Sequence, residues 1–339
     1  YKAAIDAGAG SVMASFNEVD GIPATGNRWL MTEVLRNQWG FKGFVVTDYT
    51  GIKEMIEHGV GDFQQVSALA LNAGIDMDMV SEGFLKTLPQ SLSEGKVTMQ
   101  KIDNSVRLIL SAKYDLGLFE DPYRYCNAER AKNEVFTSEN RSTARQIAGE
   151  SMVLLKNERE LLPIKKSGTI DLIGPLADSK ENMAGTWSVA TQLDKCISLK
   201  QGMEEAVGSS AEILYAKGSN LTYDPVLESN ATMFGRSLNR DNRTDAQLLN
   251  EALQVAAKSD IVVAALGESS EMNGESSCRT RLGIPDVQID LLKALLKTGK
   301  PVILVLFSGR PLVLTEENDK LETILLAWFG GSESGHSIA

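Results

Sequence analysis

The chain has 339 residues, a length that suits about two domains. Its composition, 43% hydrophobic and 23% charged, is ordinary for a soluble globular protein. The formal net charge of −11 disfavours nucleic acid and anionic membranes as partners, because both attract basic proteins. Apolar runs such as 261–266 and 302–307 are too short to span a bilayer, so we expect no membrane partner.

The first part of the chain, residues 1–117, predicts three βα units. Strand patterns lie at 11–16, 44–47 and 74–79, and helical patterns at 29–39, 52–57, 63–73, 85–92 and 101–114. A closed barrel needs eight strands, so three units leave open sheet edges. We therefore expect this domain to be part of a larger barrel or to associate as a homo-oligomer. Tyr1 is not an initiator residue, and we expect sequence to precede it.

Residues 118–136 contain few aliphatic side chains and many charges, which indicates a linker. The second domain, 137–339, opens with a long helical pattern from Ser138 to about Asn157. Strand patterns follow at 169–173, 213–216, 261–266, 302–307 and 323–328, with helical patterns at 245–258 and 287–297. This order predicts an αβα sandwich around a mostly parallel sheet. The polar segment 219–242 is expected to be a surface excursion.

Asp48 follows the apolar run Phe44-Val45-Val46 at the predicted end of a buried strand. Catalytic groups of parallel α/β folds lie at this edge of the sheet. Asp48 beside Tyr49 is therefore a candidate nucleophile or acid/base. The alternative, that Asp48 caps the next helix, is equally compatible with its position.

The loop after the 261–266 strand pattern carries three glutamates, Glu268, Glu271 and Glu275. Long loops at the carboxyl ends of strands often carry function, although a solvated charged loop is the commoner case. Two carboxylates on facing domains fit glycoside hydrolysis, in which one attacks the anomeric carbon and the other protonates the leaving oxygen. Trp187, in a glycine-bearing polar loop, suits a sugar platform, although a half-buried packing role is more frequent.

Other site classes are disfavoured by the sequence. Cys126, Cys196 and Cys278 are widely spaced and indicate neither a disulfide framework nor a zinc site. The chain has only two histidines, His58 and His336, which disfavours a histidine-based triad within it. GxGxxG and GxxxxGK[ST] nucleotide motifs are lacking. We therefore expect no metal and no cofactor.

The chain resembles glycoside hydrolase family 3 almost from end to end. The motifs that carry the resemblance are Trp29 to Asp48, Gly74 to Met79, Lys113 to Phe119, Glu150 to Asn157, Gly174 to Asp178, Gly185 to Ser188 and Gly309 to Leu312. The family's strand-end Ser-Asp-Trp pattern stands here as Thr47-Asp48-Tyr49, which gives Asp48 the nucleophile role. The family's Glu-Ala/Ser-Ser-x-Arg-Thr pattern matches Glu275 to Thr280, which makes Glu275 the acid/base rather than Glu268 or Glu271.

The resemblance also implies substrate contacts. Trp187 matches an aromatic residue at the mouth of the subsite, Phe16 lies where relatives often have Tyr near the glycone, and Arg279 belongs to the acid/base motif. Tyr49 departs from the family's Trp, which leaves the leaving-group subsite open. Further glycone-binding groups of the family would precede Tyr1, so we expect these 339 residues alone to be inactive.

The implied activity is that of a retaining, exo-acting β-glucosidase of carbohydrate metabolism, periplasmic or secreted, acting on a β-glucoside or oligosaccharide. Two alternatives within the family are a β-xylosidase and a β-N-acetylglucosaminidase. An alternative from another class is a non-catalytic sugar-binding protein.

Overall fold

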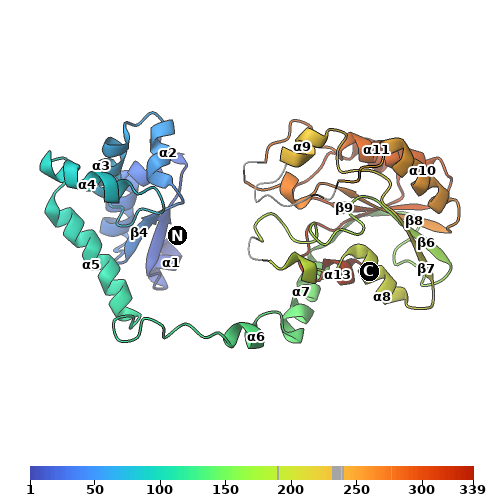
Figure 1. Cartoon of the computed structure of the whole chain (residues 1–339), viewed down its shortest axis with the longest axis horizontal. Coiled ribbons are helices and arrows are strands. Elements are labelled where there is room, and N and C mark those ends of the chain that lie inside the picture. Colours follow the sequence, from blue (N-terminus) through green and yellow to red (C-terminus); the bar gives the residue numbers. More distant parts are fainter. Residues whose placement is uncertain (189–190, 231–237, 239, 276) are drawn as a thin grey trace. The chain divides into compact units, whose positions relative to one another are not determined.

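The computed structural model describes residues 1–188, 191–230, 238, 240–275 and 277–339. The chain divides into two compact units, Tyr1–Ala128 and Glu129–Ala339, which Figure 1 colours from blue to red along the sequence. The division falls within the segment predicted to be a linker. Among the described residues, no helix combines the length and apolar character that a membrane crossing requires.

The first unit is built on two parallel strands, β1 (Ser11–Ala14) and β4 (Phe44–Thr47), paired in register from Ser11↔Phe44 to Ala14↔Thr47. The third predicted strand, at 74–79, is reduced to a single bridge between Val46 and Met77. Val80 and Glu82, which follow this predicted strand, adopt left-handed backbone conformations, with φ of 71° and 60°.

Helices pack against this small sheet. They are α1 (Lys2–Asp6), η1 (Ala24–Gly26), η2 (Trp29–Gln38), α2 (Gly51–Glu57), α3 (Phe63–Ala73), α4 (Gly83–Ser93) and α5 (Met99–Asp115). A short antiparallel hairpin, β2 (Glu18–Val19) and β3 (Ile22–Pro23), follows β1. Val45 of β4, Ile52 of α2 and Val66 of α3 are fully buried in one apolar core, so β4 is held rigidly beneath its carboxyl end.

The second unit opens with α6 (Arg130–Glu134) and α7 (Ser138–Ser151). The prediction that the helix beginning at Ser138 runs to about Asn157 is wrong, because α7 ends at Ser151. Met152 is extended, and Val153–Asn157 form strand β5, antiparallel to β10 (Thr323–Leu326). A short aliphatic run fits a helix and a strand equally well, and here pairing with β10 decides between them.

The sheet of the second unit has six strands in the order β5-β10-β9-β8-β6-β7. The remaining strands are β6 (Thr169–Ile173), β7 (Glu212–Ala216), β8 (Ile261–Gly267) and β9 (Val302–Phe307), and every pairing except β5 with β10 is parallel. The central strands β8 and β9 are almost wholly buried, as their continuous apolar sequences predict.

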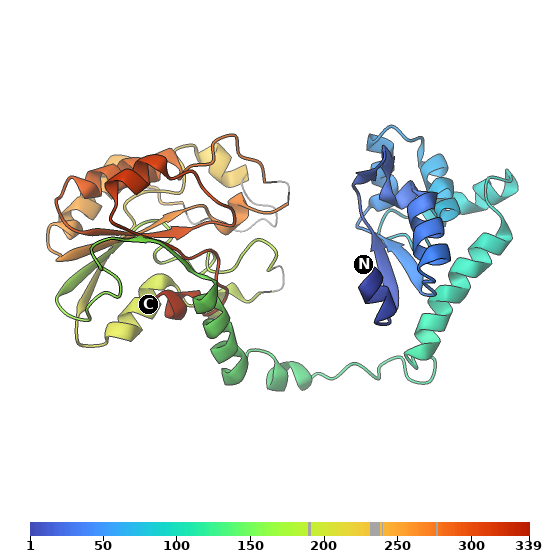
Figure 2. The same ribbon diagram turned by 180° about the vertical axis from the view of Figure 1, so that it is seen from behind.

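Helices cover both faces of this sheet, as Figures 1 and 2 show. One face packs on α8 (Leu199–Val207) and α13 (Ser334–Ile338), the other on α10 (Asp245–Ala256) and α11 (Asp286–Leu296). Shorter helices are η3 (Leu193–Lys195), α9 (Pro225–Asn230), η4 (Ser270–Met272) and α12 (Thr315–Lys320). The predicted αβα sandwich with a mostly parallel sheet is thus confirmed. Residues 231–237 and 239 of the predicted surface excursion lie outside the described residues.

Candidate active site

Asp48 lies immediately after β4, with its backbone fixed on both sides. Its N–H donates to the carbonyl of Ala14 at 3.1 Å, and its carbonyl accepts from the N–H of Gly51 at 3.0 Å. Its Oδ1 accepts from the N–H of Tyr49 at 2.7 Å. The residue at the N-cap of α2 is Thr50, not Asp48. The carboxylate of Asp48 therefore does not cap that helix, and its half-buried side chain stands at the carboxyl edge of the strand.

Two predicted substrate residues lie near the same edge of the first unit. Phe16, which is half-buried, follows β1 by two residues, and the last pair of β1 and β4 is Ala14 with Thr47. Tyr49 is 61% exposed. Because parallel strands end at a common edge, the structure gathers Phe16, Asp48 and Tyr49 there.

A buried carboxylate fixes β4 just before Asp48. Asp76 Oδ2 accepts from the N–H of Val45 at 2.8 Å and from Arg36 Nη2 at 2.5 Å, and its Oδ1 accepts from Ser105 Oγ at 2.8 Å. These bonds tie η2 and α5 to the strand that carries Asp48. The sequence does not indicate this role of Asp76, because the partners of its side chain are 29 to 40 positions away.

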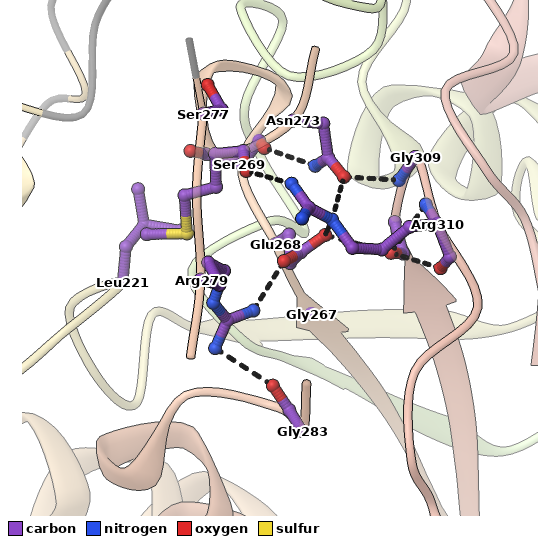
Figure 3. A network of polar contacts seen from close by, with 12 residues as sticks. Leu221, Gly267, Glu268, Ser269, Asn273, Ser277, Arg279, Gly283, Gly309 and Arg310 are labelled. Carbon is purple, nitrogen blue, oxygen red and sulfur yellow. Dashed lines mark hydrogen bonds and ion pairs between the residues drawn. The ribbon is translucent and has the colours of Figure 1, made fainter. Parts of the chain in front are cut away.

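In the second unit, Glu268 follows β8 and is 0% exposed. Its Oε1 pairs with Arg279 Nη1, and its Oε2 lies 3.3 Å from Arg310 Nε and accepts from Ser308 Oγ at 3.0 Å, as Figure 3 shows. Both carboxylate oxygens are therefore bound inside the protein, and Glu268 has no surface from which to reach a sugar.

The other two glutamates of this loop differ from each other in exposure. Glu271 is 1% exposed in η4. Glu275 is exposed and follows Gly274, whose φ is +91°. Of the three glutamates that the sequence offers, the structure thus presents only Glu275 to solvent.

The loop that carries Trp187 is bonded to the loop that carries Glu275. Thr186 is buried, and its Oγ1 donates to the carbonyl of Asn273 at 2.7 Å and contacts that of Ser270. Trp187, the next residue, is 61% exposed. The structure therefore places an exposed aromatic residue and an exposed carboxyl on two adjoining loops of the second unit.

Arg279, predicted to bind substrate, directs its guanidinium into the protein. Nη1 pairs with Glu268 and Nη2 donates to the carbonyl of Gly283 at 3.0 Å. Sequence reasoning missed Arg310, Asn273 and Thr186 as parts of this site. The register of β8 and β9 pairs Gly267 with Phe307, so the residues after them meet at one edge, and this pairing is the signal that could have found Arg310.

Comparisons with known proteins show the family of this chain. Residues 1–112 match the glycosyl hydrolase family 3 N terminal domain, and residues 152–339 match the glycosyl hydrolase family 3 C-terminal domain. The chain belongs to glycosyl hydrolase family 3. The resemblance that the sequence motifs indicated is therefore confirmed.

Individual relatives of this family 3 chain include two curated enzymes. A periplasmic β-glucosidase of Salmonella typhimurium is 45% identical over 100% of this chain and 45% of its own length. A β-xylosidase of Formosa agariphila is 32% identical over 100% of this chain and 46% of its own length. The chain thus spans less than half the length of these relatives.

Solved structures show the same fold. A β-glucosidase from Listeria innocua in complex with isofagomine matches 100% of this chain and 44% of its own, with a TM-score of 0.84 and 35% identity. The same enzyme in complex with glucose gives a TM-score of 0.83 and 36% identity. This agreement confirms the predicted fold class, a TIM-like βα part followed by an αβα sandwich.

Proposed function

We propose that this chain carries the catalytic pair of a retaining, exo-acting β-glucosidase, which removes terminal β-D-glucosyl residues from β-glucosides or oligosaccharides. Asp48 is the nucleophile and Glu275 the acid/base. The observation that carries the proposal is the selective exposure of Glu275 in a loop where Glu268 and Glu271 are buried. Family membership and the Salmonella and Listeria relatives support the β-glucosidase assignment.

The reaction proceeds in two displacements. Asp48 attacks the anomeric carbon and forms a glycosyl ester, while Glu275 gives its proton to the departing glycosidic oxygen. Glu275, now a carboxylate, then takes a proton from water, and the water oxygen attacks the anomeric carbon and releases Asp48. Two inversions give net retention. This chemistry requires the two carboxyl groups to come within about 5–5.5 Å in the working complex.

The exposed aromatic residues suit a sugar substrate. Tyr49 and Trp187 offer apolar ring faces that stack on the C–H faces of pyranose rings. Phe16 lies at the strand edge beside Asp48 and is proposed to contact the glycone. Arg279 was predicted to bind substrate, and its bonds to Glu268 and Gly283 support a role in shaping the loop.

A β-xylosidase is the second candidate, because the Formosa β-xylosidase matches this chain over its whole length. Xylose differs from glucose by the missing hydroxymethyl group. The two activities are distinguished by comparing kcat/KM for nitrophenyl β-glucoside and nitrophenyl β-xyloside with the full-length protein that contains this chain.

The test of the proposed function is the anomer that forms first. Proton NMR of the full-length protein acting on nitrophenyl β-glucoside should show β-glucose before α-glucose appears by mutarotation. Initial α-glucose would show inversion and contradict the proposal. Binding of glucosides without any turnover would favour the sugar-binding alternative. The Salmonella relative also supports a periplasmic or secreted location, which cell fractionation tests.

A further inference from the structure

Glu268 takes no part in the mechanism above, yet it is the most completely buried carboxylate of the loop that carries Glu275. Burying a charge is costly unless it is paired and hydrogen-bonded. Here Arg279, Arg310 and Ser308 supply the partners. Such an arrangement requires an explanation beyond stability, because well-packed apolar residues often stabilise a core as well as a buried ion pair does.

One of these partners holds the backbone that precedes Glu275. Arg310 Nη2 donates to the carbonyl of Met272 at 2.6 Å, and its Nε donates to Asn273 Oδ1 at 3.0 Å. The N–H of Gly309 donates to the same Oδ1 at 3.1 Å. Arg310 therefore binds Met272 and Asn273, the two residues immediately before Gly274 and Glu275. Its Nε also lies 3.3 Å from Oε2 of Glu268.

The other partner holds the backbone that follows Glu275. Arg279 is four positions beyond Glu275, and its guanidinium bridges Glu268 and the carbonyl of Gly283. Figure 3 shows both arginines converging on the Glu268 carboxylate from different segments. Both sides of the Glu275 segment are thus fastened to one buried anion.

We propose that Glu268 is a positioning residue for acid/base catalysis, which acts through Arg279 and Arg310 to hold the backbone on each side of Glu275. This inference rests on the proposed function of Glu275. An exposed side chain on a long loop would otherwise sample many orientations, and a displacement of about 1 Å from productive geometry can cost about 100-fold in rate. The planar, multidentate guanidinium is suited to this task, because one group binds a carboxylate and backbone carbonyls at fixed angles.

The experiment uses Glu268→Gln in the full-length protein and compares kcat/KM for 2,4-dinitrophenyl and phenyl β-glucosides. A misplaced acid should slow the phenyl glucoside, which needs protonation, by about 100-fold, and leave the dinitrophenyl glucoside nearly unchanged. The matched control is Glu333→Gln, which removes another buried, arginine-paired carboxylate of the same unit. In Glu333→Gln, the ratio of kcat/KM for the dinitrophenyl glucoside to that for the phenyl glucoside should equal the ratio in the unsubstituted protein.

Two further variants make the result decisive. Arg310→Lys keeps a positive charge beside Glu268 but cannot bind both Met272 and Asn273. It should therefore also slow the phenyl glucoside more than the dinitrophenyl glucoside, a difference that we call the leaving-group bias, but by a smaller factor than Glu268→Gln. This variant tests the proposal even if Glu268→Gln fails to fold. In a Glu275→Ala background, Glu268→Gln should cause no additional bias. The positioning role would be overturned if Glu268→Gln lowered kcat/KM equally for both glucosides. It would also be overturned if Glu268→Gln added to the leaving-group bias in the Glu275→Ala background. If Glu275→Ala alone causes no bias, the proposed function fails instead.

Discussion

Gly274 packs so tightly against Thr186 that a Cβ atom on Gly274 would require Thr186 to shift. A Cβ atom placed on Gly274 would lie 3.1 Å from the Cβ of Thr186, and the φ of Gly274 is +91°. Thr186 Oγ1 also donates to the carbonyl of Asn273 at 2.7 Å. The loop of Trp187 and the loop of Glu275 are therefore joined at a point where both the tight contact and the positive φ favour glycine.

Gly274→Ala should destabilise the second unit and impair catalysis. The left-handed backbone and the contact with Thr186 together should cost about 1–3 kcal/mol of unfolding free energy, and Glu275 should be displaced. Calorimetry and kcat/KM on an aryl glucoside measure the two effects. Gly299→Ala is the control, because Gly299 has φ +72° and no atom within 4 Å of an added Cβ. Loss of activity of equal size in both variants would refute the specific role of the Thr186 contact.

Asp48 should be the residue that a mechanism-based inhibitor labels. A 2-fluoro β-glucoside slows release of the glycosyl ester, so peptide mapping of the inactivated full-length protein should find the sugar on Asp48. Asp48→Ala should abolish turnover. Asp78 provides the internal comparison, since its Oδ2 instead accepts from the N–H groups of Gly83 and Phe84 at 2.6 and 3.3 Å. Labelling of Asp78, or activity in Asp48→Ala, would disprove the assignment.

Much of the fold follows from local sequence signals. The continuous apolar runs predict β8 and β9, and Phe63 to Ala73 is a helix with the predicted bounds, opened by a capping box of Asp62 and Gln65. The error at Val153–Asn157 arose because its strand pairs with β10, over 160 residues away, and the local pattern does not contain that partner.

The candidate site, like the fold, has parts that the sequence predicts and parts that it does not. The motifs predict Asp48 and Glu275 as the catalytic pair, and the structure adds a physical reason to prefer Glu275, namely the burial of Glu268 and Glu271. The contacts of Glu268 with Arg310 and of Thr186 with Asn273 could not be predicted, because they join segments about 40 and 90 residues apart. Short motifs therefore predict the chemical groups of the site, whereas the long-range bonds that orient those groups require the structure.

Asp171 of β6 should make stability fall as pH rises. It is 0% exposed, and burial raises the pKa of its carboxyl, while Ser259 and Lys300 oppose this shift only in part. A raised pKa in the folded state favours folding below the ordinary pKa of Asp and loses that contribution as pH rises through the folded value. Asp171→Asn removes this titration without changing the shape of the side chain.

Calorimetric melting of the second unit from about pH 4 to about pH 8 measures the effect. The difference in Tm, Asp171→Asn minus the unsubstituted protein, should grow as pH increases. A difference in Tm that stays constant across this pH range would show that the carboxyl of Asp171 does not titrate with folding.

The most direct measurement of the central claim is azide rescue of the three glutamate variants in the full-length protein. Glu275→Ala should slow the phenyl glucoside by about 10²–10⁴-fold and spare the dinitrophenyl glucoside, and added azide should restore turnover with β-glucosyl azide as product. Glu268→Ala and Glu271→Ala keep the Glu275 carboxylate, which repels azide, so they should yield no glucosyl azide. Formation of β-glucosyl azide by either of those variants, with none from Glu275→Ala, would contradict the account.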